Sequence, residues 1–183
     1  MRKHFRLAVA ALALAGASAT VAAQDQLAAG TWTIGTTLMT FGAGPQAGLQ
    51  VSSGGGASVT RFGANGAVGY LMSKQLELGG NVLFGTVSGG GGASFTTFGI
   101  GPYVRYWLKT SEKGGWNVGG QINIFSPGGG ASNVTNFGAF GGYSFFVNNG
   151  ISLDLVVPIQ ISSGGGTSVT TFGFGFGVTG FLR

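Results

Sequence analysis

The chain has little of what holds small exported or soluble domains together. It has no cysteine, so we expect neither disulfides nor a lipid-modified cysteine. Only 7% of its 183 residues are charged, where about a quarter is usual in soluble proteins. After residue 23 no run approaches the roughly 18 apolar residues that a transmembrane helix needs. Closed β-barrels are the other structure that satisfies every backbone group in lipid.

Histidine is nearly absent as well, because His4 is the only one. His4 belongs to the N-terminal segment that we expect to be removed. The remaining chain has no histidine, which excludes Ser–His–Asp catalysis and most transition-metal sites. An enzyme that uses serine or aspartate alone is disfavoured, since no activating base is evident. The glycine triplets lack the Lys-Ser/Thr pair of a phosphate-binding loop and are interpreted as turns. We therefore expect no enzymatic activity, no catalytic residue, no metal site and no cofactor.

The N-terminal segment has the order of a secretory signal peptide. Met1–Arg6 is basic, Leu7–Ala17 is apolar, and small residues follow as far as Ala23. We expect residues 1–23 to be removed, leaving a single domain over 24–183. Six cations and four anions then remain, a net charge of +2. These charges are scattered and form no basic stripe, so nucleic acid is not an expected partner.

One motif of glycine, serine or threonine, and phenylalanine occurs four times. The copies are Ser53–Gly63, Gly90–Gly99, Pro127–Gly138 and Ser163–Gly173. Their phenylalanines, Phe62, Phe98, Phe137 and Phe172, are 35 to 39 residues apart. The repeating unit is a strand, a glycine turn, a second strand and a polar turn, which predicts four hairpins and eight strands.

The segments between turns alternate with the period of two that is typical of strands with unlike faces. Residues 151–161 carry Ile, Leu and Val at odd positions, with Ser152, Asp154 and Gln160 among the even ones. The expected strands are 31–41, 59–72, 76–88, 95–108, 116–126, 134–147, 151–162 and 169–182. Residues 42–58 extend the first strand or form a loop. The predicted fold class is all-β, an eight-stranded antiparallel up-and-down transmembrane β-barrel.

The aromatic residues form two tiers on one face. The outer tier consists of Phe62, Phe98 and Phe137, next to the glycine turns. The other tier, eight residues further along the same strands, consists of Tyr70, Tyr106 and Phe145. All tryptophans and tyrosines lie toward the end away from the glycine turns, as in an interfacial aromatic belt. The expected belt residues are Trp32, Tyr70, Tyr106, Trp107, Trp116 and Tyr143.

Four charged residues have the parity of the other, lumenal face. Glu77 and Arg105 are equally far from Gly91, so a symmetric hairpin places them opposite each other on adjacent strands. Arg61 and Asp154 are expected to point inward near opposite ends. The favoured interpretation of Glu77 and Arg105 is a structural ion pair, because eight strands leave an interior that side chains fill. A gate or selectivity element is the alternative.

The whole pattern resembles the small outer-membrane β-barrel superfamily that includes OmpA- and OmpX-type barrels. The resemblance implies periplasmic termini, outward glycine turns, and recognition by the barrel-insertion machinery. Members usually end in an aromatic residue after alternating apolar ones. Here Phe172, Phe174, Phe176, Val178 and Leu182 keep the alternation, but Arg183 follows. Membrane lipid, lipopolysaccharide and the insertion machinery are the expected partners, and the oligomeric state stays open.

The function expected from the sequence is that of a non-enzymatic integral outer-membrane protein with a structural or surface-interaction role. A narrow pore for small solutes or ions is the alternative, because lumenal glycines would leave space. These glycines are Gly63, Gly99, Gly101, Gly119, Gly138, Gly173, Gly175 and Gly177. A soluble secreted barrel or a glycine-rich fibre is a further hypothesis.

Overall fold

The computed structural model describes residues 27–42, 48–54, 57–89, 92–126, 132–164 and 167–183. The predicted signal peptide lies outside these ranges. The strands are β1 Trp32–Gly42, β2 Gly48–Gly54, β3 Ala57–Leu71, β4 Leu76–Gly89, β5 Gly92–Ser111, β6 Gly114–Ser126, β7 Val134–Asn148, β8 Ile151–Gly164 and β9 Thr167–Leu182. No helix in the described part of the chain is long and apolar enough to cross a membrane.

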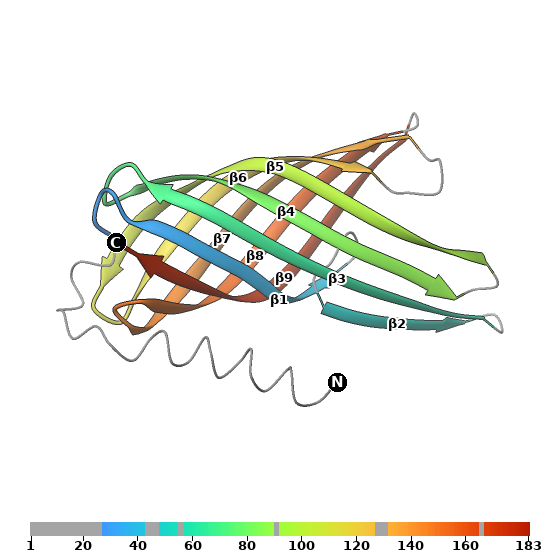
Figure 1. Cartoon of the computed structure of the whole chain (residues 1–183), viewed down its shortest axis with the longest axis horizontal. Coiled ribbons are helices and arrows are strands. Elements are labelled where there is room, and N and C mark those ends of the chain that lie inside the picture. The colour runs from blue at the N-terminus through green and yellow to red at the C-terminus, as the bar shows by residue number, and fades with distance from the viewer. Residues whose placement is uncertain (1–26, 43–47, 55–56, 90–91, 127–131, 165–166) are drawn as a thin grey trace.

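The strands form one closed antiparallel barrel (Figure 1). From β3 to β9 each strand pairs with the next, and β1 closes the cylinder by pairing with both β9 and β3. β2 continues the path of β1 along β3, from Gly48 opposite Gly63 to Gly54 opposite Ala57. β1 and β2 therefore count as one interrupted strand of the barrel, so the predicted eight-stranded barrel is confirmed. For residues 42–58 the sequence left two interpretations, a loop or an extension of the first strand. Residues 48–54 extend the first strand.

Strand ends agree with the sequence prediction to within a few residues, and β5 differs most. It spans 20 residues and continues to Ser111, because Thr110 and Ser111 still pair with Gly115 and Gly114 of β6. A register shift between Trp107 and Lys109 accompanies this extension. The hairpin ends in the exposed turn residues Glu112 and Lys113.

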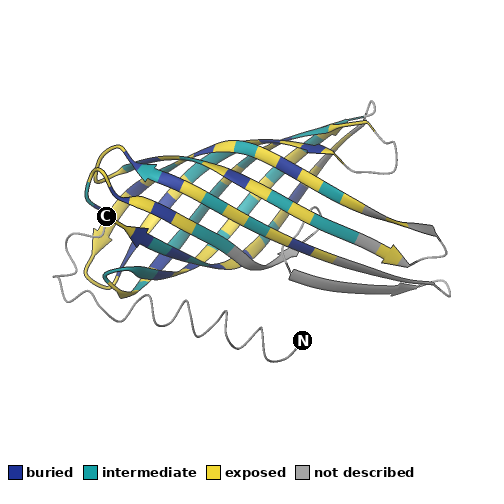
Figure 2. Ribbon diagram, viewed as in Figure 1, coloured by how far each residue is buried: buried dark blue, intermediate teal, exposed yellow. Residues whose placement is uncertain are grey.

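Exposed and less exposed residues alternate along the strands (Figure 2). On β8, Leu155 and Val157 are exposed while Val156 between them is half-buried. On β5, Ile100 and Val104 are exposed, and Tyr103 is buried. The faces predicted for these strands are confirmed, with large apolar residues outside and small or polar ones inside. This is the arrangement of a barrel that faces lipid.

Candidate functional site in the barrel lumen

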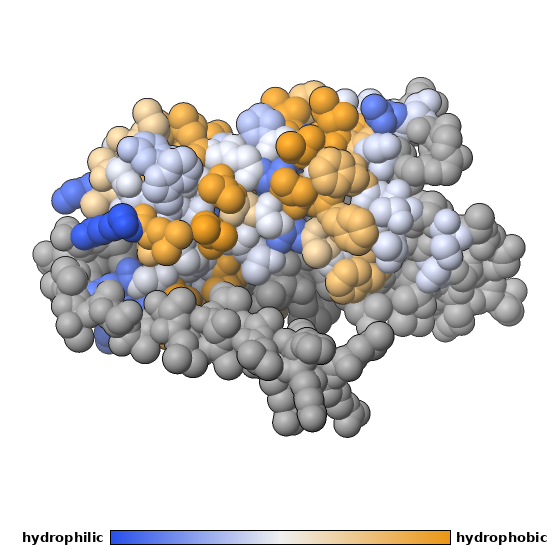
Figure 3. Space-filling view, in the orientation of Figure 1, coloured by the Kyte–Doolittle hydropathy of each residue, from blue (hydrophilic) through white to orange (hydrophobic). Residues whose placement is uncertain are grey.

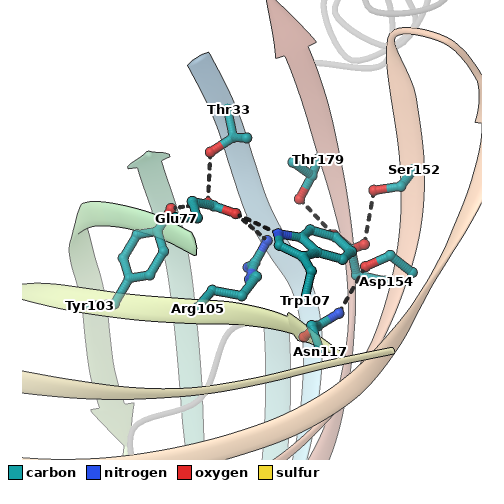
Figure 4. Close-up of polar contacts among 10 residues, drawn as sticks. Thr33, Glu77, Tyr103, Arg105, Trp107, Asn117, Ser152, Asp154 and Thr179 are labelled. Atoms are coloured by element: carbon teal, nitrogen blue, oxygen red, sulfur yellow. Dashed lines mark hydrogen bonds and ion pairs between the residues drawn. The ribbon is translucent and has the colours of Figure 1, made fainter. Parts of the chain in front are cut away.

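A cluster around one carboxylate occupies the lumen (Figure 4). Glu77 of β4 is directly opposite Arg105 of β5, as the symmetric hairpin predicts. Arg105 Nη1 lies 3.4 Å from Glu77 Oε2. The Glu77 side chain is 0% exposed and that of Arg105 is 16% exposed. The structure thus brings these two predicted residues together inside the barrel.

Glu77 accepts three further hydrogen bonds, all from neutral groups. Thr33 Oγ1 of β1 donates to Oε1 at 2.8 Å, and the Tyr103 hydroxyl donates to the same oxygen at 2.6 Å. The Trp107 indole N–H donates to Oε2 at 3.4 Å. Hydrogen bonds to a carboxylate that is shielded from solvent are stronger than the same bonds in water. The parity of Tyr103 indicates a lumenal position, but only barrel closure brings Thr33 here.

The Arg105 guanidinium lies among aromatic rings. Its central carbon is 5.7 Å from the ring centroids of Tyr103 and Trp107 and 5.9 Å from that of Phe140. Such cation–π contacts lower the cost of holding a cation away from water. Arg105 Nε is buried and has no hydrogen-bond partner among the described residues. The guanidinium is therefore held by one carboxylate and by ring faces.

Trp107 corrects the sequence analysis, which places it in the aromatic belt. Its side chain is 1% exposed and lies inside the barrel. The reason is the period of two: Tyr106 and Leu108 on either side of it are exposed, so Trp107 faces the lumen. Inside, it donates its N–H to Glu77. The distance of Trp107 from the end of the strand gives its level along the barrel axis. Its odd position in the alternating pattern gives the face, which is the lumenal one.

The other predicted belt residues lie on the outward face near one end of the barrel. Trp32, Tyr106 and Trp116 are exposed, and Tyr70 and Tyr143 are half-buried. Trp32 packs edge-to-face on Tyr70, and Trp116 packs in the same way on Tyr143, both with ring centroids 5.0 Å apart. Edge-to-face pairs of this kind are favourable contacts between rings. Their placement fits a membrane interface.

Asp154 forms a second buried carboxylate site. It accepts hydrogen bonds from Ser152 Oγ at 2.9 Å and Thr179 Oγ1 at 2.6 Å. Its side chain faces the lumen, as predicted. Arg61, the fourth predicted lumenal charge, lies on β3 opposite Val87, and its side chain is outside the described part. Asp154 is thus held by hydroxyl donors on β8 and β9.

Several lumenal glycines are covered by large neighbouring side chains. A Cβ at Gly99 would lie 2.6 Å from the Phe125 ring, and one at Gly138 would lie 3.0 Å from Gln121. A Cβ at Gly119 would collide with the Phe140 ring. These glycines accommodate packing inside the barrel. At these positions the missing side chain leaves room for the neighbouring ring or amide.

An apolar plug lies inside the barrel near the C-terminus of the chain. We define it as Leu27, Leu71, Trp107, Phe146 and Phe181. Phe146 packs on Trp107 and Phe181, with ring centroids 6.2 and 5.9 Å apart. Backbone hydrogen bonds between Leu71 and residues 30 and 31 fix the segment that carries Leu27. The sequence analysis missed the plug because Leu27 precedes the first strand and fits no alternating pattern.

Comparisons with known proteins agree with the architecture. No family model and no curated protein matches the chain. Neisserial surface protein A matches at 17% identity and TM-score 0.59, over 83% of this chain and 97% of that one. The N-terminal barrel domain of Pseudomonas aeruginosa OprF matches at 10% identity and TM-score 0.55, over 84% and 98%. The outer membrane protein OprG from P. aeruginosa matches at 10% and 0.51, over 85% and 97%.

At these identities the likeness establishes the fold alone. Each similar structure is covered almost completely, so the match extends over a whole barrel and not over a single hairpin. The apolar outer face and the closed sheet agree with it independently. In its fold, the chain is a closed eight-stranded antiparallel β-barrel like those of the solved structures it matches.

Proposed function

We propose that the chain is a non-enzymatic integral outer-membrane protein with a structural or surface-interaction role, and that its lumen does not conduct. The observation that carries the proposal is the apolar plug, which lies inside the barrel at the end with the aromatic belt. A path for ions or solutes would have to pass Leu71 and Trp107, both of which are fully buried. Apolar side chains without water form a barrier to polar solutes.

The outward face supports the membrane location. Large apolar residues such as Ile100, Ile124 and Phe172 are about half exposed or more. Burying a side chain of this size is worth about 1.5–3 kcal/mol, so a bilayer stabilises the barrel and water destabilises it. The exposed apolar face therefore supports insertion into lipid over a soluble secreted barrel.

The lumenal charges support a structural role. A selectivity element has to present its charge to a passing ion. Glu77 is instead fully buried and accepts four hydrogen bonds, three of them from neutral donors. Asp154 is held by two hydroxyls. Both carboxylates connect strands and are occupied by the protein itself, which favours the interpretation of Glu77 and Arg105 as a structural pair.

One observation favours the narrow-pore alternative. The Arg105 side chain is 16% exposed although it points inward, and the lumenal residues Val156 and Gln160 are half-buried. Solvent therefore reaches part of the lumen. Conductance would require this space to continue through the apolar plug.

Planar-bilayer recording of the purified protein separates the two functions. We expect no steady single-channel conductance from the wild type. The double change Leu71→Ala and Trp107→Ala should introduce conductance, because it removes the two buried side chains that a path would have to pass. Leu155→Ala, a truncation on the lipid face, is the matched control and should stay silent. Steady conductance of the wild type would replace the structural role by the pore.

A further inference from the structure

A bulge in β5 turns one lysine to the outside of the barrel. Trp107 is directly opposite Asn117 of β6, and both side chains are buried. The next pair joins Lys109 to Trp116, and both of these side chains are exposed. In regular alternation Lys109 would share the lumenal face of Trp107. Leu108 is an extra residue between the two pairs, so the alternation shifts by one position and Lys109 comes to the outward face.

The bulge places Lys109 beside part of the aromatic belt. Residues directly opposite each other in an antiparallel pair lie on the same face, with Cβ atoms about 4.5–5.5 Å apart. Trp116, the partner of Lys109, packs edge-to-face on Tyr143 of β7 with ring centroids 5.0 Å apart. Tyr143 packs in turn on Phe145 at 4.6 Å. Such rings are typical of the border between hydrocarbon and headgroups, so Lys109 lies at the level of lipid headgroups.

Two turns bring further exposed lysines to this side of the barrel. Lys74 lies in the turn before β4, and the backbone N–H of Trp107 donates to the carbonyl of Gln75 at 2.8 Å, which holds this turn beside β5. Lys113 lies in the β5–β6 turn, and its carbonyl accepts a hydrogen bond from the backbone N–H of Phe146 on β7 at 3.0 Å. Both turns are therefore fixed to the wall that carries Lys109. We define the lysine patch as Lys74, Lys109 and Lys113.

The lysine patch is positively charged and borders the apolar wall. Glu112 is the acidic residue of the same two turns, so three positive charges face one negative charge and leave a net charge of +2. In Figure 3 blue, hydrophilic side chains lie at the left end of the barrel, and orange, hydrophobic ones spread over the wall next to it. Charges that are separate in the sequence thus meet in the folded barrel. This surface suits a molecule with an anionic head and an apolar tail.

We propose that the lysine patch and the Trp116–Tyr143 ring pair bind an anionic glycerophospholipid of the surrounding bilayer. The lysines donate charge-assisted hydrogen bonds to the phosphate, and the rings contact the glycerol and the upper part of the acyl chains. A zwitterionic lipid carries its own cation beside the phosphate, so a positive patch attracts it less than an anionic lipid. This inference rests on the membrane location that is part of the proposed function.

The test is a competition between an anionic and a zwitterionic lipid. The protein is folded into phosphatidylcholine vesicles that contain a minor share of phosphatidylglycerol, and the lipids retained after extraction are counted by native mass spectrometry. We expect phosphatidylglycerol to be retained above its share in the vesicles, and this excess to disappear in about 0.5 M salt, which screens ionic contacts. Lys109→Gln should lower the excess about fivefold, the usual effect of one lysine near anionic lipid. Replacing all three lysines by glutamine should abolish it.

Arg183→Gln is the charge-matched control. Arg183 is an exposed cation at the same end of the barrel, but it follows β9, which is four strands from β5 in the sheet. This variant should retain phosphatidylglycerol as the wild type does. Equal losses for Arg183→Gln and Lys109→Gln would overturn the local site, as would an excess that resists salt or survives the triple change. Displacement by soluble glycerol phosphate at the same concentration would overturn the lipid as the ligand. Failure of the wild type to insert, seen as loss of heat-modifiable gel mobility, would instead contradict the proposed function.

Discussion

Tyr103 and Arg105 lie two residues apart on β5 and contact opposite oxygens of the Glu77 carboxylate, Tyr103 at 2.6 Å and Arg105 at 3.4 Å. The shorter hydrogen bond comes from the neutral group. Charge-assisted hydrogen bonds of the O–H···O⁻ type are short and strong. The carboxylate is therefore stabilised by its neutral donors as well as by the ion pair.

Tyr103→Phe should destabilise the barrel by about 1–3 kcal/mol, because it leaves a buried charged acceptor without its shortest hydrogen bond. The measurement is urea unfolding in lipid vesicles. Tyr106→Phe is the control, since that hydroxyl is exposed and bonds to Gln75 at 3.1 Å. Equal losses for the two variants would show that the Tyr103 hydroxyl contributes nothing specific.

Replacing Glu77 and replacing Arg105 should reduce the folding stability by different amounts. Glu77→Gln leaves the largely buried Arg105 without its carboxylate at 3.4 Å, and stranding a buried charge costs up to about 3–5 kcal/mol. Arg105→Gln should cost less, because Glu77 keeps Thr33, Tyr103 and Trp107 as donors. The double variant should lose less stability than the sum of the single losses. Strictly additive losses in the unfolding assay would contradict the coupling.

Substitutions on β8 test which face meets lipid. Leu155→Arg should cost about 2–4 kcal/mol if the residue lies near the bilayer midplane. Val156→Thr should cost less than Leu155→Arg, because Val156 is a half-buried residue of the lumenal face. Folding free energies in vesicles of phosphatidylcholine give the comparison. A larger loss for Val156→Thr would reverse the assigned faces.

Gly119→Ala should destabilise the barrel by about 1–3 kcal/mol, the usual range for overpacking, because its methyl group would collide with Phe140. Adding Phe140→Leu should restore part of the loss. Gly66→Ala is the control, since nothing lies within 4 Å of a Cβ there. Unfolding midpoints that rank Gly66→Ala as the more damaging change would contradict the packing described for the lumen.

Period-two alternation predicted the barrel, its faces and the opposition of Glu77 and Arg105, because in a sheet parity and hairpin symmetry follow from local sequence. The same parity indicates that Trp107 is lumenal, although its height along the strand suggested the belt. The Thr33 contact depends on closure between β1 and β3, a non-local pairing that alternation does not encode. Leu27 precedes every strand, so no strand pattern includes it.

The apolar plug is completed only where β9 meets β1. Leu27 precedes β1 and Phe181 lies in β9, yet both belong to the same cluster. The cluster therefore depends on closure of the sheet between β1 and β9, and no single hairpin contains it. Closure of the sheet thus brings Phe181 of β9 onto Phe146 of β7, a contact between strands that are not neighbours in the sheet.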